Sequence, residues 1–287
     1  ESSDLKQKAE AYLYLGASEG YIGVFEYGEG NLITALINGL QADNHFEKAL
    51  ELDAQMVDAY FGLGVYRYAN SRLGGLGNFI MQGGNDLREV GLNHLERALQ
   101  MNTRAKPLTM KTLAWFYISE QINPDNAEVQ LNHPLHPSQS RRRSIELIDE
   151  MEEHYFEKSP HSDFVGNKEV ALMKAIQFVI DKNYSKARRE FLKVKNIIIY
   201  LVDRGLKINP QLTGSVQAGI EFCELMLLSE VSSGNAERDA TCSKIDEKVS
   251  FLHSGGSMIE HDSRKIRSEL HGVFAEALDT LFRKMNC

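Results

Sequence analysis

The feature that most constrains the fold of this chain is an internal repeat in its N-terminal part. A tyrosine, a leucine and a glycine occur twice in the same order, 48 residues apart: Tyr12, Leu15 and Gly16, and then Tyr60, Leu63 and Gly64. Downstream, a second block recurs at an offset of 49 residues, at positions 46–52 and 95–101. Two blocks repeated in one order predict a duplicated unit that must stack on its neighbours to bury its apolar faces.

The repeated pattern is an aromatic residue and Leu-Gly, followed later by an aromatic or leucine residue and Ala. It resembles the signature of the tetratricopeptide repeat family. In this interpretation Gly64 leaves room for a neighbouring helix, and Ala49 and Ala98 do the same on the second helix of each pair. The resemblance implies an all-α fold, a right-handed superhelical solenoid of antiparallel helix pairs. The alternative is a generic helical bundle with alanine and glycine at its helix crossings.

Further helix pairs are predicted along the chain, and we therefore expect a single solenoid domain over residues 1–287. Apolar residues at helical spacing predict three more pairs, namely 110–117 with 144–151, 164–180 with 183–194, and 211–230 with 236–252. The most regular repeats cover residues 4–103 and 163–200, and residues 123–139 form a Pro- and Asn-rich connector. A last amphipathic helix over residues 257–286 is predicted to cap the end of the stack.

The first two repeats are longer than those of the family. A tetratricopeptide repeat has about 34 residues, whereas the repeats here have about 48. In the first repeat the additional residues predict two helices that are each about two turns longer than usual, with a break at residues 28–31. In the second they predict a glycine-rich loop over residues 74–86, in which Asp86 caps the next helix.

Residues 58–68 read Asp-Ala-Tyr-x-Gly-Leu-Gly-x-Tyr-x-Tyr, which is similar to a group of bacterial repeat proteins that are exported to the cell envelope. The resemblance implies a location in the bacterial periplasm or cell envelope, and the cytoplasm is the alternative. Because the sequence begins at Glu1 and not at Met, we expect that an N-terminal segment preceded it, with a signal peptide or a lipid anchor as the candidates.

Composition narrows the classes of partner. The chain is 43% hydrophobic and 25% charged, which suffices for a sizeable core. Its net charge of −8 argues against nucleic acid, and no stretch has the about 18–20 apolar residues of a membrane-spanning helix. The basic run at residues 141–143 is interpreted as a solvated loop or helix start, and a site for a polyanion is the alternative. Of the cysteines, Cys223 is predicted to be a core thiol, and a bridge from it to Cys242 is the less favoured alternative.

Candidate catalytic and metal sites are weak. His133 and His136 are the closest histidine pair, but they lie in the connector without a cysteine or carboxylate cluster at ligand spacing. The glycines at 74–77 and 83–84 precede no Lys-Ser/Thr and follow no predicted strand, so they match neither a phosphate loop nor a dinucleotide fingerprint. We therefore expect no enzymatic activity, no metal and no cofactor.

The first helices of tetratricopeptide repeats line a concave groove. The resemblance places eight candidate groove residues on three such helices: Glu10, Leu13, Tyr21, Asp58, Phe61, Tyr68, Lys111 and Trp115. Aromatic side chains flanked by charge suit a peptide or a partner helix, and the alternative is that these side chains belong to the core. Family members that clamp a C-terminal carboxylate present Lys and Asn here, and only Lys111 fits that pattern.

The expected function is a non-catalytic scaffold that binds another protein or a peptide on the concave face, with a homo-oligomer as a further candidate partner. The alternative is a periplasmic ligand-binding accessory protein of a transport system, which holds a small apolar or organic-acid molecule between the long helices. An open groove favours the first function, and a closed apolar cavity of several hundred cubic ångströms favours the second.

Overall fold

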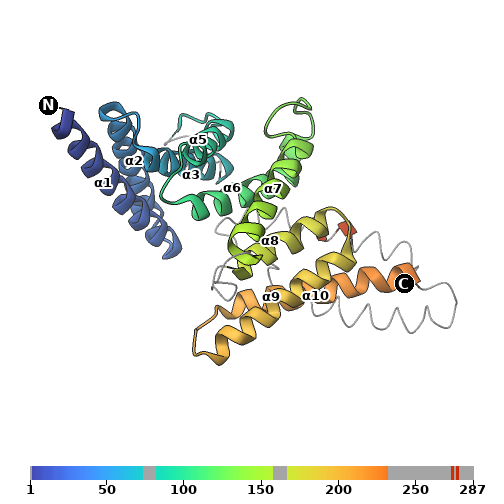
Figure 1. Ribbon diagram of the computed structural model, residues 1–287. Helices are drawn as coiled ribbons and strands as arrows, with labels where there is room; N and C mark the ends of the chain where they lie inside the picture. The colour runs from blue at the N-terminus through green and yellow to red at the C-terminus, as the bar shows by residue number, and fades with distance from the viewer. Residues whose placement is uncertain (1, 74–81, 158–166, 232–272, 275, 278–287) are drawn as a thin grey trace. The chain divides into compact units, whose positions relative to one another are not determined.

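The computed structural model of the chain describes residues 2–73, 82–157, 167–231, 273–274 and 276–277. Every regular element in this part is helical, which confirms the predicted all-α fold (Figure 1). The α-helices are α1 (Ser2–Gly28), α2 (Leu32–Leu52), α3 (Val57–Leu73), α5 (Arg88–Gln100), α6 (Lys106–Gln121), α7 (Pro137–Met151), α8 (Asn167–Ile180), α9 (Tyr184–Asp203) and α10 (Pro210–Val231). A short 3-10 helix spans Pro124–Asn126, and a π-helical turn spans Glu152–Glu157.

The chain divides into two compact units, Glu1–Phe116 and Tyr117–Cys287. The first unit holds α1, α2, α3, α5 and the larger part of α6, and the second holds the end of α6 and the helices from α7 onward. The single solenoid expected over residues 1–287 stays a prediction, and each unit is described by itself.

In the first unit, α1 and α2 form an antiparallel hairpin around a line of small residues (Figure 1). A Cβ atom on Gly16 would lie 2.8 Å from the Phe46 ring, and one on Gly23 would lie 3.3 Å from the Ala35 carbonyl. The helices can approach this closely because these positions carry no side chain. As predicted, both helices are long: α1 has 27 residues and α2 has 21, against 17 in α3 and 13 in α5.

The second hairpin, α3 with α5, has its crossing at two facing glycines. A Cβ atom on Gly64 would lie 2.6 Å from Leu95 Cγ and 2.8 Å from the Gly91 carbonyl oxygen. Gly91 in turn lies against the backbone nitrogen of Tyr68. The prediction that Gly64 marks a close helix crossing is confirmed. Before α5, Asp86 accepts a hydrogen bond from the Arg88 amide, but the N-cap residue of α5 is Leu87, so the predicted cap is displaced by one residue.

In the second unit, buried amides join α6, α7 and α8. Gln121 and Gln177 exchange hydrogen bonds of 3.0 and 2.8 Å between their side chains. The Ser144 hydroxyl on α7 donates to Gln177 Oε1 at 2.8 Å. At the edge of this network, Arg141 makes a two-pronged ion pair with Asp181. Because each buried amide has partners, the polar groups hold three helices in one register at little cost in desolvation.

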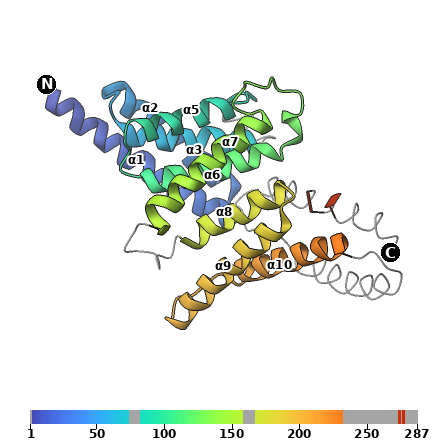
Figure 2. The same cartoon turned by 45° about the vertical axis from the view of Figure 1, so that its right-hand side comes forward.

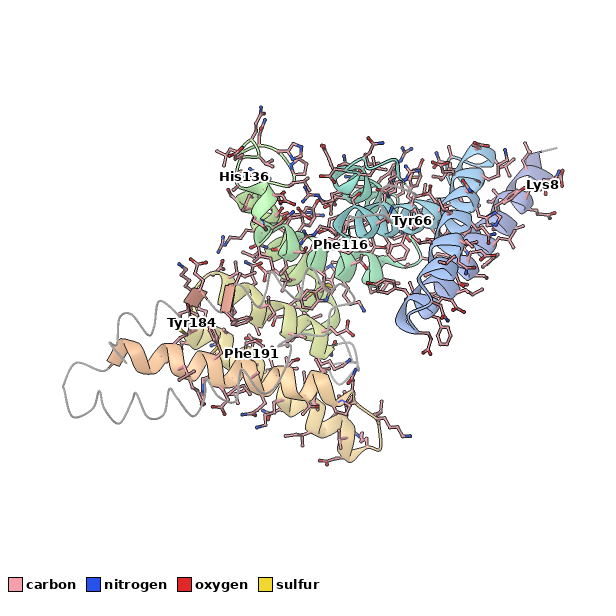
Figure 3. The ribbon with its side chains drawn as sticks, turned by 180° about the vertical axis from the view of Figure 1, so that it is seen from behind. Lys8, Tyr66, Phe116, His136, Tyr184 and Phe191 are labelled. Carbon is pink, nitrogen blue, oxygen red and sulfur yellow. The ribbon has the colours of Figure 1, made fainter. Side chains whose placement is uncertain are left out.

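Helices α9 and α10 run antiparallel and side by side in both views (Figures 1 and 2). Phe191 of α9 packs where Gly219 of α10 leaves space, since a Cβ atom there would lie 2.5 Å from the ring (Figure 3). Arg188 donates to Glu224 beside this crossing. On α10, Phe222 meets Phe274 edge-on with ring centroids 4.5 Å apart. Phe274 is one of the four residues of the predicted capping helix, 273–274 and 276–277, that the structure describes.

The other predicted elements agree with the structure where it describes them. Residues 110–117 lie in α6 and residues 144–151 in α7, with their apolar positions buried. The predicted start at Asn183 is confirmed, because its side chain caps α9 by accepting from the Lys186 amide. The predicted helix at 236–252 and most of that at 257–286 lie outside the described residues, as do residues 74–81 and 158–166.

Candidate binding groove

A surface depression of about 200 Å3 lies in the first unit, between the start of α1, the turn from α2 to α3 and the turn from α5 to α6. Three of the predicted groove residues, Glu10, Leu13 and Asp58, line it. The structure therefore brings together candidates from two successive repeats. Its other walls carry Lys6 and Arg104, so the depression combines apolar surface with charges of both signs.

Asp58 has a structural task in this depression. Its carboxylate accepts a 2.5 Å hydrogen bond from the Thr103 hydroxyl and a 3.2 Å hydrogen bond from the Arg104 amide. Thr103 Oγ1 also accepts from the Ala105 amide, at the start of α6. Asp58 thus holds the turn between α5 and α6 against α3. A carboxylate with two such partners fixes the wall of the groove and is less available to a ligand.

Leu13 forms the apolar part of the depression. It packs against the core cluster that joins α1, α2 and α3, yet its side chain is only partly buried. Met56 and Val57 lie beside it at the start of α3. The result is an apolar patch at the centre of the depression, with Glu10 and Lys6 on its α1 side. Such a surface can take one or two side chains of a bound chain.

The remaining five candidates do not line this depression. Tyr21 is on α1 and is highly exposed, while Phe61, Lys111 and Trp115 are partly buried. Tyr68 is fully buried: its ring stacks on Phe116 with centroids 3.7 Å apart, and its hydroxyl donates to the Phe116 carbonyl at 3.1 Å. For Tyr68 the core alternative is correct, because the side chain that the repeat register directs inward is covered by α6.

A polar cluster between α2, α3 and α5 was not predicted from the sequence. Arg67 pairs with both Asp43 and Glu47 of α2. Two buried atoms next to this network, Tyr66 OH and His94 Nδ1, have no hydrogen-bond partner, and Asp43 Oδ1 has only its 3.4 Å ion-pair contact with Arg67 Nε (Figure 3 labels Tyr66). The three residues are far apart in sequence and no motif joins them, so only the packing of the two hairpins brings them together.

Burial shifts the pKa values of this cluster. The pKa of His94 is lowered to about 4, first by burial and then by the charges of Arg67 and Arg97. Burial also raises the pKa of Asp43, against the opposing effect of Arg67, and it raises the pKa of Tyr66. His94 is therefore neutral at pH 7.

The two connector histidines cap their own turns. His133 Nδ1 accepts from the Leu135 amide at 3.2 Å, and His136 Nδ1 accepts from the Ser138 amide at 3.1 Å, which makes His136 the N-cap of α7. Among the described residues, no group of three or more His, Cys, Asp or Glu side chains is arranged to hold a metal ion. The role of His136 as a helix cap was missed because caps are usually Ser, Thr, Asp or Asn.

Residues 16–20 have the spacing Gly-x-Ser-x-Gly, so the expectation that the chain contains no such motif is wrong. In hydrolases this motif forms a sharp turn between a strand and a helix, which exposes the serine as a nucleophile. Here all five residues lie inside α1, with continuous helix on both sides. The backbone therefore makes no such turn, and Ser18 lies on an exposed helix surface.

Cys223 is fully buried and is a free thiol, as predicted. Burial raises its pKa to about 12, so the thiol is protonated and inert at neutral pH. Cys242, the other half of the alternative disulfide, lies outside the described residues. The basic run at 141–143 lies on α7, where Arg141 and Arg143 pair with carboxylates, which agrees with a solvated helix surface.

Comparisons with known proteins add no family to these observations. The chain matches no protein-family model, and neither curated proteins nor solved structures give a match. No helix among the described residues has the length and apolar character needed to cross a membrane.

Proposed function

We propose that this chain is a non-catalytic scaffold of the tetratricopeptide type, which binds another protein or a peptide on the α1–α3 side of its first unit. The supporting observation is the depression of about 200 Å3 that Glu10, Leu13 and Asp58 line together. Glu10 and Asp58 occupy equivalent positions of the two repeats, which supports a groove along successive first helices, although Phe61, the equivalent of Leu13, does not line the depression.

The size of the depression favours a peptide over a small molecule. Small-molecule sites usually enclose about 300–1,000 Å3 and bury most of the ligand, whereas this depression has about 200 Å3 and is open. It suits one or two side chains of a longer chain whose remaining residues lie on the surface. The accessory protein of a transport system would need a larger and more enclosed cavity than this depression, so the depression favours the scaffold.

The charges suggest how a peptide would be oriented. Lys6 of α1 and Arg104 of the turn before α6 both line the depression, and so do three carboxylates, Glu10, Asp53 and Asp58. A peptide with an apolar anchor flanked by charges of both signs fits this lining, because the anchor is desolvated and each flanking charge meets an opposite one. Asp58 keeps the Arg104 wall in place through its hydrogen bonds to the turn.

The test is selection of binders from a random peptide library displayed on phage, followed by titration of the selected peptides. We expect peptides with an apolar anchor and flanking charges of both signs, whose affinity falls at least tenfold, about 1.4 kcal/mol, when Lys6 and Arg104 are both replaced by Glu. The matched control is Lys48→Glu, an exposed lysine on α2 that does not line the depression. The proposal fails if no peptide binds, or if both variants weaken binding equally.

A further inference from the structure

The outer face of α1 exposes large apolar side chains. Tyr14 is 63% exposed, Tyr21 is 75% and Phe25 is 65%. Leu15, Ile22 and Val24 on the same helix are also exposed. Helices that are apolar on all sides are normally covered, and exposed apolar patches larger than a few hundred square ångströms usually mark interaction sites. This face of α1 is therefore expected to bind a partner.

The repeat shows what this face does elsewhere in the molecule. Ala11 and Leu15 of α1 are equivalent to Ala59 and Leu63 of α3 at the offset of 48 residues. In α3 both residues are buried in the cluster that packs on α2. The outer face of α1 is thus the stacking face of the repeat, and it lies at the end of the first unit. In repeat proteins such terminal faces are usually polar.

A further repeat of the same kind does not fit on α1. In α3 the stacking face has a hole at Gly62, where a Cβ atom would lie 2.4 Å from the ring of Phe46 in the preceding helix. The equivalent residue of α1 is Tyr14, which fills that position and projects from the surface. A preceding helix with a large side chain at the place of Phe46 would collide with Tyr14. The occupant must therefore have a different shape.

The spacing on α1 matches a helix of its own sequence running in the opposite direction. Five outer residues, at steps of three and four, form one uncharged line: Ala11, Tyr14, Ser18, Tyr21 and Phe25. This is the spacing of the seam in a two-helix coiled coil. With the two-fold axis at Ser18, residues whose numbers add up to 36 lie opposite one another, so the small Ala11 of one copy faces the large Phe25 of the other. Tyr14 then faces Ile22, and Tyr21 faces Leu15. A large residue thus meets a small one at both ends of the line, whereas parallel helices in register would place Phe25 against Phe25.

We propose that two copies of this chain associate through antiparallel packing of their α1 helices. Charge agrees with this partner: Lys8, near the start of the helix (Figure 3), would lie next to Glu29, just after the end of the partner's helix. The line between them carries no charge, so no like charges meet at the axis. A two-fold contact of this kind closes and limits the assembly to a dimer.

The available area suits a dimer. Aromatic side chains have about 150–250 Å2 of surface each, and roughly two thirds of Tyr14, Tyr21 and Phe25 is exposed, which gives on the order of 400 Å2. The aliphatic neighbours on α1 bring the face toward the about 800 Å2 per partner that stable interfaces bury. An anionic membrane surface is a poorer occupant, because interfacial helices are rich in Lys and Arg and residues 9–47 contain neither.

The first experiment measures molar mass by light scattering after gel filtration, from about 1 to 100 µM. We expect a dimer that Tyr21→Glu converts to a monomer, with association weakened at least 100-fold. The matched control is Ile33→Glu, at a residue of α2 that is also 75% exposed but lies off the proposed line; it should leave the dimer intact. Circular dichroism checks that both variants stay folded. A monomeric wild type, or a dimer that survives Tyr21→Glu, overturns the proposal.

The second experiment tests the register by oxidation of single cysteines, with Cys242 and Cys287 replaced by Ser and the buried Cys223 kept. Ser18→Cys should form a covalent dimer, because this residue faces itself across the axis. Phe25→Cys should not crosslink alone, but should do so when mixed with Ala11→Cys. Efficient self-crosslinking of Phe25→Cys would indicate parallel helices and overturn the antiparallel arrangement. Tyr14 also lines the depression of the proposed function, but neither experiment involves a peptide ligand, so a failure of this inference is distinguishable from a failure of the proposed function.

Discussion

The two hairpins of the first unit, α1–α2 and α3–α5, share one sequence pattern but have different surroundings. In α1–α2, Tyr12 lies against His45 with ring centroids 5.8 Å apart, and in α3–α5 the equivalent Tyr60 and His94 are 5.7 Å apart. Duplicated sequence has thus given duplicated packing inside each hairpin. Contacts within one pair of helices depend on residues that the repeat carries with it, and these contacts are the same in both copies.

Outside the hairpins the two copies differ. Leu15 of α1 is 48% exposed, whereas the equivalent Leu63 of α3 is 2% exposed. Leu63 packs on Phe46 and Ala49 of the preceding hairpin, and α1 has no such hairpin in front of it among the described residues. The same residue at the same repeat position is core in one copy and surface in the other. Whether a stacking face is buried therefore depends on whether another hairpin packs on it.

The largest expected effect is that of Gly64→Leu in the second hairpin. The new side chain would collide with the Gly91 carbonyl and with Leu95, and a helix backbone cannot move aside as a side chain can. We expect the free energy of unfolding to fall by about 3 kcal/mol or more. Urea denaturation followed by circular dichroism measures it. A change below about 1 kcal/mol would mean that this crossing is looser than the structure has it.

Substitution of the two equivalent leucines, Leu15 and Leu63, by alanine tests the difference between the exposed and the buried stacking face. Leu63→Ala should cost about 2–3 kcal/mol, because it leaves a cavity in a packed cluster. Leu15→Ala should cost less than about 0.5 kcal/mol, measured below the concentration at which copies associate. Thermal and urea unfolding of both variants give the two values. Equal losses would show that the outer face of α1 is covered within the monomer.

The pH dependence of stability should separate the hairpins further. The pKa of His94 is lowered from 6.5 to about 4 by burial, Arg67 and Arg97. As the pH falls, the unfolded chain therefore binds a proton on His94 near pH 6.5, whereas the folded chain binds it only near pH 4. The stability contributed by neutral His94 is fully present above about pH 6.5 and decreases as the pH falls toward 4. The raised pKa of Asp43 acts in the opposite direction over the range above 3.8.

We expect His94→Gln to reduce the loss of melting temperature between about pH 7 and pH 5, relative to the wild type. The matched variant is His45→Gln, at the equivalent position of the first hairpin, which is not part of the Arg67 cluster. Melting curves at several pH values compare the three proteins. If the two variants change the pH dependence to the same extent, burial of His94 is not its cause.

The smallest expected effect is a stabilisation by Gly20→Ala in the first hairpin. A Cβ atom on Gly20 would make an ordinary contact, 3.9 Å from the Cβ of Ala42, so the methyl group fits. Alanine favours a helix over glycine by about 0.5–1 kcal/mol, and we expect a gain of this size in urea unfolding. A loss would show that the two long helices pack more closely at Gly20 than the structure has them.

The sequence by itself determined the features of this protein that depend on residues near in sequence or on the repeat. The repeat and its spacing predicted the helices, the long first hairpin with its break before α2, the close crossing at Gly64 and the capped start of α9 at Asn183. These features could be read because helical periodicity and glycine spacing reflect contacts between residues that are near in sequence, or that the repeat brings back at a fixed interval.

Only the tertiary structure decided which of the candidate side chains are available. It buried Tyr68 under Phe116, tied Asp58 to the turn before α6, and left Tyr14 and Tyr21 on an open face. A helical pattern gives the side of the helix on which a residue lies, but whether that side is covered depends on chain segments that are distant in sequence. The physical reason is that burial is set by the neighbours that pack on a face, and the residues of the face do not specify them.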